Sequence, residues 1–386
     1  MATPAVTINH LDRNPMAARS TEFVERKGLG HPDSICDGIA DAISRRLSSY
    51  YRDEFGTILH HNTDKVQLVA GHTEPAFGGG ELVDPIYVLI GGRATKSYDG
   101  TPIPVDDLAV QAARDYVADR FEHLPRDGIE FDARIGETSP DLQTLYDSAG
   151  VPRANDTSVG VGYAPLSETD RIVRDLGAEL RSRIPAVGDD LKVMGWRGPD
   201  HLQLTVAAAI VSRLVDDLTA YLEVIERVEA TATAFASERT DRAVSVDVNA
   251  ADDPDTASVY LTETGLSAEM GDDGNVGRGN RVNGVITPHR PMSLEAAAGK
   301  NPVSHVGKLY NLVARNAAER IHRGMGAAYA EVKLLSQIGQ PITDPLAIDV
   351  DTTSADDAEI ERIVLEELND IESLTPTVVA GDVQVF

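Results

Sequence analysis

The residues best suited to chemistry lie close together in the stretch GDDGNVGRGNRVNG, residues 271–284. Adjacent carboxylates, Asp272 and Asp273, are ligands that a hard divalent cation prefers, and such a cation usually bridges phosphate oxygens. Arg278 and Arg281 carry planar guanidinium groups that bind phosphate through paired hydrogen bonds. The glycines between them let the main chain approach a ligand closely. The stretch therefore predicts a loop that holds a metal-bound polyphosphate. A solvated loop of Asx turns is one alternative, and Ca²⁺ competes with Mg²⁺, although the acids lack the spacing of an EF-hand.

A second motif, GLGHPDS at residues 28–34, precedes a segment with helical spacing of its apolar residues. His31 and Asp33 would then lie at a helix N-terminus, where free N–H groups and the helix dipole favour an anion. We expect His31 to donate to a phosphate or ether oxygen and Asp33 to ligate Mg²⁺. The alternative is a capping turn in which Asp33 caps the helix and His31 is exposed.

Two further stretches add cations. AAAGKNPVSHVGK contains Lys300, His305 and Lys308, but it lacks the glycine spacing of a Walker A motif. GDDLKVMG contributes Asp190 and Lys192, for which an exposed strand end is the alternative reading. Together with Asp33, Asp272 and the arginines, these residues describe a site for a nucleoside triphosphate with its Mg²⁺. Their types do not say which bond is broken.

Composition narrows the possible classes of protein. The 386 residues are enough for two or three domains, and the formal net charge of −27 argues against a nucleic-acid partner. Only seven of the 35 basic residues are lysines, which favours a surface adapted to high salt over an ordinary acidic surface. No apolar run spans a membrane and no signal peptide is visible, so we expect a cytoplasmic protein. The single cysteine, Cys36, is expected in the core, and the His60–His61 pair at a strand edge.

Apolar periodicity predicts helices near 35–55, 104–124, 303–325 and 356–371, and a further strand and helices within 167–184 and 205–236, with strands between the helices. Strand pairs mixed with helices indicate an α+β fold whose sheets are covered by helices on one face. By length, we place domain boundaries near 135 and 260. The expected blocks are residues 1–135, 136–260 and 261–386.

Seven stretches, in order along nearly the whole chain, resemble the S-adenosylmethionine synthetase family of the archaeal type. They include VERKGLGHPDSICDGIA, FGTILHHNTDKVQLVAGH, IPAVGDDLKVMG, SAEMGDDGNVGRGNRVNGVITPHRPMS and GKNPVSHVGKLYN. The resemblance implies three similar β/α domains around a pseudo-threefold axis. It implies synthesis of S-adenosylmethionine from methionine and ATP, with hydrolysis of the tripolyphosphate intermediate. It also implies two Mg²⁺ ions, activation by K⁺, and a homodimer or tetramer with active sites at the dimer interface.

The resemblance assigns roles to single residues. His31, Lys192, Arg278 and Lys300 match catalytic residues; Asp33, Asp64, Asp272 and Asp273 match acids that hold cations. The nucleotide side would include Gly136, Thr138, Ser139, Asp141, Asp156, Asp190, Arg281 and Lys308. Arg93, Thr138 and Asp272 would lie near methionine.

The chain departs from the bacterial pattern at Ser34 and Gly279, where that branch has lysines, and at Arg93, where it has a glutamate. A second lysine is missing near residues 304–305. Lys27, Lys308, Arg281 or Arg93 are the candidates to supply the lost charge. A different Mg-ATP enzyme, a kinase or nucleotidyl transferase, and a silent nucleotide-binding protein are the two alternatives from other classes.

Overall fold

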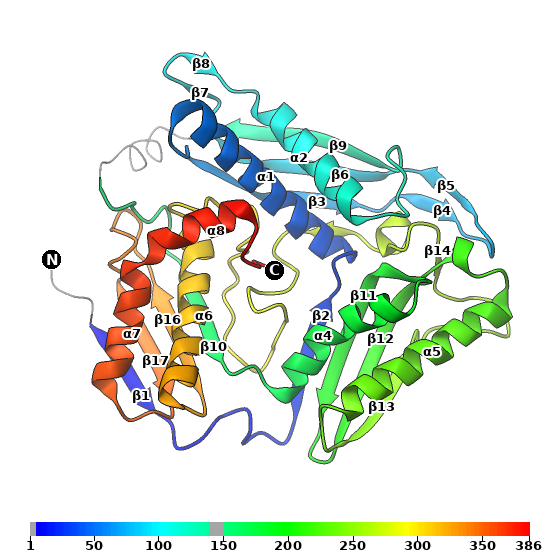
Figure 1. Cartoon of the computed structure of the whole chain (residues 1–386). Coiled ribbons are helices and arrows are strands. Elements are labelled where there is room, and N and C mark those ends of the chain that lie inside the picture. Colours follow the sequence, from blue (N-terminus) through cyan, green and yellow to red (C-terminus); the bar gives the residue numbers. More distant parts are fainter. Residues whose placement is uncertain (1–4, 139–149) are drawn as a thin grey trace.

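Three large sheets, each covered on one face by a pair of helices, form the core of the protein (Figure 1). The computed structural model describes residues 5–138 and 150–386. Within these ranges, none of the helices has the length and apolar character needed to cross a membrane. Each sheet has its own hydrophobic cluster beneath its helices. The expected α+β class with sheets covered on one face is confirmed.

The first sheet has the strand order β15-β3-β6-β9. Helix α1 presents apolar residues four positions apart, Ile35, Ile39, Ile43 and Leu47, to this sheet, and all are buried. The elements are α1 (Pro32–Phe55), β3 (His61–Val69), β6 (Ile86–Ala94), α2 (Val105–Arg120), β9 (Ile129–Glu137) and the short edge strand β15 (Gly274–Asn275).

The second sheet has the order β13-β12-β11-β2, and α4 and α5 cover it. A capping box between Ser167 and Asp170 begins α4. The elements are β2 (Glu22–Lys27), α4 (Glu168–Arg183), β11 (Val187–Arg197), β12 (His201–Val211), α5 (Leu218–Ser237) and β13 (Ala243–Val248), with β14 (Leu261–Thr262) beside β12.

The third sheet has the order β1-β17-β16-β10, and α6 packs against β10 and β16 with α7 beside it. The elements are β1 (Val6–His10), β10 (Val159–Ala164), α6 (Val306–Met325), β16 (Ala330–Leu335), β17 (Ala347–Thr352) and α7 (Asp357–Asn369). The smaller elements are the ribbons β4 (His72–Glu74) with β5 (Glu81–Asp84) and β7 (Ser97–Tyr98) with β8 (Thr101–Pro102), and the C-terminal α8 (Leu374–Ala380).

The same series of strand pairings recurs in all three sheets. An added edge strand pairs antiparallel with the first strand of a hairpin, and the second hairpin strand then pairs in parallel with a fourth strand. In the first two sheets a helix, α2 or α5, connects the parallel pair. In the third sheet, α7 follows β17 but the parallel strand is β1, from the beginning of the chain. Three units therefore share one pattern although no repeat is visible in the sequence.

Several strands cross the limits of the expected sequence blocks. Strands β1 and β2 belong to the third and second sheets, although both lie before residue 135. Strand β10 joins the third sheet from the middle of the chain, and β15 joins the first sheet from residue 274. The blocks 1–135, 136–260 and 261–386 stay a prediction, and each draws an edge strand from another part of the chain.

The face of the sheets opposite the helices carries large apolar side chains. In β6, Ile86, Val88 and Ile90 point to the core, while Tyr87 and Leu89 alternate with them and are each 37 % exposed. Phe23 in β2 and both Met194 and Trp196 in β11 are exposed in the same way. An apolar sheet face of this kind is typical of a surface that another protein covers.

Candidate active site

The candidate active site begins at the N-terminus of α1, where His31 is the helix cap. His31 Nδ1 accepts a hydrogen bond of 3.1 Å from the Asp33 backbone N–H, and the imidazole is buried. Because Nδ1 accepts, the neutral ring carries its hydrogen on Nε2, which faces the Asp272 carboxylate at 3.6 Å. The alternative, in which Asp33 caps the helix and His31 is exposed, is therefore wrong.

Asp33 lies at the centre of a buried hydrogen-bond network. Its Oδ2 is 2.7 Å from Lys27 Nζ, and its Oδ1 accepts from the Asn275 N–H at 2.9 Å. Lys27 Nζ also donates to the Arg278 carbonyl at 2.8 Å, and the Lys27 backbone exchanges two hydrogen bonds with the Asn280 amide. Lys27 and Asp33 therefore fix the glycine-rich loop against the start of α1.

The two arginines of this loop have different roles. Arg281 is partly buried and donates to the carbonyls of Gly277 and Gly279, at 2.7 and 2.6 Å, so it stabilises the loop from within. Arg278 is exposed, and its guanidinium forms no hydrogen bond or ion pair with any residue of the described ranges. The loop thus holds the Arg278 backbone in place and leaves its side chain free for a ligand.

The β2–β11 pair brings a third segment to the site. Gly30 lies so close to β11 that a Cβ atom there would be 2.6 Å from the Cβ of Asp189. The next residue, Asp190, is buried and accepts hydrogen bonds from the Ser267 N–H and hydroxyl, and burial raises its pKa to about 6. Lys192 pairs in register with Lys27, and its half-exposed ammonium is 3.4 Å from Glu25.

The charged groups of these segments lie close enough to His31 to influence its pKa. The pKa of His31 is lowered to about 4. Burial is the main cause, the charges of Lys27, Lys192 and Arg278 contribute to the lowering, and Asp33 opposes it. His31 is therefore neutral at physiological pH and acts as a hydrogen-bond donor through Nε2. The structure brings His31, Asp33, Asp190, Lys192, Asp272 and Arg278 together, as predicted from the motifs.

Asp37, one helical turn after Asp33, is a residue that the sequence analysis missed. Its Oδ1 accepts from the Gly277 N–H at 2.8 Å, while the buried Oδ2 has no hydrogen-bond partner in the described part of the chain. A Cβ atom at Gly279 would collide with this Oδ2, which explains why the loop has glycine there. The sequence did contain a signal for Asp37. A carboxyl group lies there in a helix between the buried residues Cys36 and Ile39.

The Asp37→Asn variant should gain stability relative to the wild type as the pH rises. Burial raises the pKa of Asp37 to about 7, so its stabilising contribution is complete below the unfolded pKa and is lost as pH increases toward 7. The difference in unfolding free energy between Asp37→Asn and wild type should therefore grow between pH 4 and 7, by at most about 4 kcal/mol, and then stay constant. Denaturant unfolding across this range measures it. Asp53→Asn, exposed on the same helix, is the control, and a flat difference for Asp37→Asn contradicts the prediction.

A second group of charges surrounds Asp64 in β3. Lys300 Nζ contacts the Asp64 carboxylate and is 3.1 Å from Glu295, and Lys65 Nζ is 2.6 Å from the other Asp64 oxygen. Burial would raise the pKa of Asp64, but these two ammonium groups together hold it below its usual range. Both Asp64 oxygens are thus occupied by lysines, and this arrangement gives no support to Asp64 as a cation ligand.

Lys308 is fully buried and forms an ion pair of 2.9 Å with Asp41 on α1. It is therefore a structural residue in this arrangement rather than a source of charge for a ligand. His305 caps α6 through Nδ1, and burial lowers its pKa well below the usual value.

The Lys308→Met variant should lower the free energy of unfolding by about 3–5 kcal/mol, because it leaves Asp41 buried without its partner. The double variant Lys308→Met/Asp41→Leu should recover much of that loss, since it removes both charges. Chemical denaturation of the three proteins gives the values. A Lys308→Met protein of normal stability with weakened tripolyphosphate binding would instead place Lys308 at the ligand.

The remaining predicted residues lie away from His31. Arg93 and Gly136 are opposite each other in the β6–β9 pair, and the Arg93 guanidinium donates to the Glu137 carbonyl at 3.5 Å. Thr138 Oγ1 is 2.9 Å from His60 Nδ1. Asp156 precedes β10, where its carbonyl accepts from Ser336 and its carboxylate from the Thr157 N–H. Ser139 and Asp141 lie outside the described residues.

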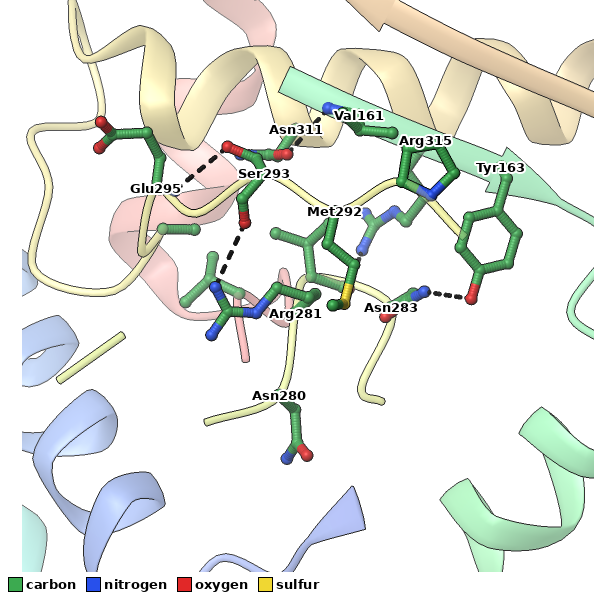
Figure 2. Close-up of a pocket in the computed structure, with 15 residues that line it drawn as sticks. Val161, Tyr163, Asn280, Arg281, Asn283, Met292, Ser293, Glu295, Asn311 and Arg315 are labelled. Atoms are coloured by element: carbon green, nitrogen blue, oxygen red, sulfur yellow. Dashed lines mark hydrogen bonds between the residues drawn. The ribbon is translucent and has the colours of Figure 1, made fainter. Parts of the chain in front are cut away.

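Figure 2 shows a pocket behind the glycine-rich loop, lined on one side by loop residues and on the other by β10 and α6. Arg281 extends across it toward the Ser293 carbonyl, and Asn283 donates to the Tyr163 hydroxyl at 2.8 Å. Arg315 donates to the Val282 carbonyl at 2.9 Å. These hydrogen bonds fix the conformation of the glycine-rich loop, which also carries Arg278.

The carboxylates suit Mg²⁺ only if a ligand completes the coordination. In the described ranges no group of three or more His, Cys, Asp or Glu residues could hold a metal alone. Mg²⁺ needs only one or two protein carboxylates when phosphate oxygens and water fill the other positions. Asp272 is more than half exposed beside His31, whereas Asp273 Oδ1 is bound by the Ala70 N–H. Asp272 is the better fit, since both oxygens of the neighbouring Asp33 already accept hydrogen bonds.

Comparison with known proteins decides the family. Residues 4–382 match the family described as S-adenosylmethionine synthetase (AdoMet synthetase). The chain belongs to this family. It is 50 % identical to the S-adenosylmethionine synthase of Haloarcula marismortui over 379 residues, covering 95 % of each chain. The synthase of Archaeoglobus fulgidus is 48 % identical, with 99 % of this chain and all of that protein covered.

The fold of the family agrees with the structure. An unusual S-adenosylmethionine synthetase from Campylobacter jejuni superposes with a TM-score of 0.62 over 95 % of each chain, at 16 % identity. Halophilic synthetases are among the relatives, in agreement with the acid-rich, lysine-poor surface. The resemblance recognised in the motifs is thus confirmed.

Proposed function

We propose that this protein makes S-adenosylmethionine from ATP and methionine and then hydrolyses the tripolyphosphate to diphosphate and phosphate. The observation that carries the proposal is the convergence of neutral His31 with the cations Lys27, Lys192 and Arg278 at the N-terminus of α1. A helix N-terminus that is surrounded by cations is suited to a polyphosphate. Membership of the S-adenosylmethionine synthetase family supports this reading.

The reaction places few demands on proton transfer. A thioether sulfur attacks the ribose C5′ carbon without a general base, so the protein must align the reactants and stabilise the departing charge. His31 Nε2–H is the donor available near the bond that breaks, and it stays neutral because its pKa is about 4. Arg278, which has no side-chain partner in the described ranges, and Lys192, which is half exposed and 3.4 Å from Glu25, carry the side-chain charges that would bind the leaving tripolyphosphate.

Lys27 is our candidate for the charge that the bacterial branch supplies with lysines at positions 34 and 279. Its ammonium lies at Asp33 and the Arg278 carbonyl, close to both positions. Arg281 and Lys308 are engaged elsewhere, in the loop and with Asp41. Arg93, beside Gly136, remains a candidate for the methionine side, with Thr138 and Lys300 on the neighbouring strands and loop.

Mg²⁺ would be held by Asp272 together with phosphate oxygens, and it would neutralise polyphosphate charge. Asp33 would join it only by exchanging one of its present partners, the Lys27 ammonium or the Asn275 N–H. A second Mg²⁺ and an activating K⁺ belong to the same proposal. Asp273 keeps one carboxylate oxygen free for such an ion, whereas Asp64 does not.

A homodimer would explain two features of the single chain. The apolar sheet face with Tyr87, Leu89, Met194 and Trp196 is exposed. Among the described residues, Lys300, Arg93 and Asp156 form their hydrogen bonds and ion pairs with groups other than His31. In a dimer whose active sites lie at this face, one subunit can complete the site of the other. The recurring pairing order of the three sheets supports three similar domains around a pseudo-threefold axis. A cytoplasmic location fits these small-molecule substrates.

The decisive experiment incubates the protein with ATP, methionine, Mg²⁺ and KCl and measures S-adenosylmethionine, diphosphate and phosphate together. All three products are expected, and omission of methionine should abolish the sulfonium product. Formation of ADP or AMP would indicate a kinase or nucleotidyl transferase. Binding of Mg-ATP without turnover would indicate a nucleotide-binding protein without this activity.

A further inference from the structure

A second basic hollow lies behind the glycine-rich loop, between α4 and the C-terminal half of α6. It has an empty volume of about 900 Å³, part of it open to solvent. Arg171 and Arg174 face it from α4, three positions apart, and Arg315 and Arg323 face it from α6, eight positions apart. These spacings place each pair on one side of its helix. Two helices thus direct their arginines into one space.

The charge in this hollow is opposite to that of the whole molecule. Four guanidinium groups and His322 line it, and Glu319 is the one carboxylate among its described lining residues. The chain as a whole carries a formal charge of −27. A surface adapted to high salt does not require several arginines close together. We therefore take this group of arginines as an indication of a site for a specific anion.

Two of these guanidinium groups lack a carboxylate partner. Arg323 is 3.4 Å from Glu319, and Arg174 is 2.6 Å from Asp175. Arg171 donates to the Leu166 carbonyl, and Arg315 donates to the Val282 carbonyl and the Asn316 side chain. In the described ranges neither Arg171 nor Arg315 forms an ion pair within 4 Å. Their remaining N–H groups are available to an oxyanion.

The hollow also touches the back of the active-site loop. Val282 and Asn283 of that loop line it, and Figure 2 shows Arg315, Tyr163 and Asn283 side by side at the shared wall. A Cβ atom at Gly284 would lie 3.4 Å from Arg174 Cδ. The same arginines that face the hollow therefore contact the loop that carries Arg278, which they approach from the opposite side.

We propose that this hollow is a second binding site for a phosphate-type oxyanion, either free orthophosphate or diphosphate or the phosphate tail of a nucleotide, held by Arg171, Arg174, Arg315 and Arg323. Guanidinium groups match the geometry of phosphate oxygens and bind them through paired hydrogen bonds. The site is separate from the one at His31 and does not depend on the reaction proposed above.

Calorimetric titration of the full chain with sodium diphosphate, at fixed low KCl to limit screening, tests the site. The wild type should bind two diphosphates per chain. Arg171→Gln/Arg323→Gln should weaken one of the two at least about tenfold, the effect of losing one charge-assisted contact. Both side chains are exposed, so folding should be retained. Arg227→Gln/Arg239→Gln, which removes two exposed arginines near α5, is the matched control and should keep both events.

The variant Arg278→Leu separates this proposal from the proposed function, because it should weaken the other event alone. If Arg278→Leu changes neither event, the active-site assignment fails while the second site stands. ATP is then titrated into Arg278→Leu and into Arg278→Leu that also carries Arg171→Gln/Arg323→Gln. If the first protein binds ATP and the second binds it more weakly, the hollow takes a nucleotide tail. If neither protein binds ATP, the hollow takes a free anion. A single event in the wild type that Arg278→Leu abolishes, or equal binding by Arg171→Gln/Arg323→Gln and wild type, would overturn the second site.

Discussion

Arg278→Leu is expected to lower kcat by about 10³-fold with little change in stability. Removal of one preorganised donor at a developing negative charge costs about 10²–10³ in rate, and an arginine on a phosphoryl group costs about 10³ or more. Arg278 meets the structural conditions for such a donor. Its carbonyl is fixed by Lys27 and the adjacent Gly277 N–H by Asp37, while its guanidinium has no partner in the described residues.

Steady-state rates for S-adenosylmethionine and for tripolyphosphate hydrolysis check this expectation. Arg278→Lys keeps the charge but loses the planar fork, so it should fall between the wild type and Arg278→Leu. Arg227→Leu on α5 is the control for the loss of one exposed arginine. A near-normal kcat in Arg278→Leu would refute the role of Arg278 at the leaving group.

Asp33→Asn is expected to lower kcat by about 10²–10³-fold, for a reason that the hydrogen-bond network supplies. Asp33 accepts at both oxygens, from the Lys27 ammonium and from the Asn275 N–H. Asparagine has the same shape but one acceptor oxygen, so its NH₂ group must face one of these two donors. Either orientation displaces Lys27 or the loop at Asn275, and both changes move Arg278.

Turnover and Mg²⁺ dependence should be measured for Asp33→Asn beside Asp53→Asn, an exposed substitution on the same helix. If Asp33 also binds Mg²⁺, higher Mg²⁺ concentrations should recover part of the lost rate. Unchanged turnover at low Mg²⁺ would contradict both roles, and thermal unfolding of the two variants shows whether the loss reflects folding instead.

The sequence predicted the site residues that lie in dense polar motifs. His31, Asp33, Asp190, Lys192, Asp272 and Arg278 were singled out because glycines, acids and cations are close together in short stretches, and their roles stay a prediction. The α1 helix was found because its apolar residues recur four positions apart. In such stretches the local pattern alone carries the information.

Other features depended on contacts between distant segments. The two arginines of the glycine-rich loop look equivalent in the sequence, and only the fold shows that Arg281 binds loop carbonyls while Arg278 is free. Lys300 and Lys308 both look like phosphate ligands, yet Asp64 in β3 binds Lys300 and Asp41 in α1 binds Lys308. Asp37 was missed because its partner, the Gly277 N–H, lies 240 residues away.

Strand pairing shows the same limit. The sequence predicted strands between the helices, but it did not predict which strands are neighbours in the sheets. Period and composition do not reveal that β15 joins β3 or that β2 joins β11, because register and partner choice depend on the assembled core.

The place of β1 in the third sheet has a consequence for how the chain is made. Asn9 bonds to Asp349 and Asp351 across this pairing, and 340 positions separate Asn9 from Asp349. A ribosome therefore releases β1 long before β17, so β1 stays without its native neighbour while the residues between them are made. Biogenesis of this protein must keep an early, unpaired segment from aggregating until β17 has been made.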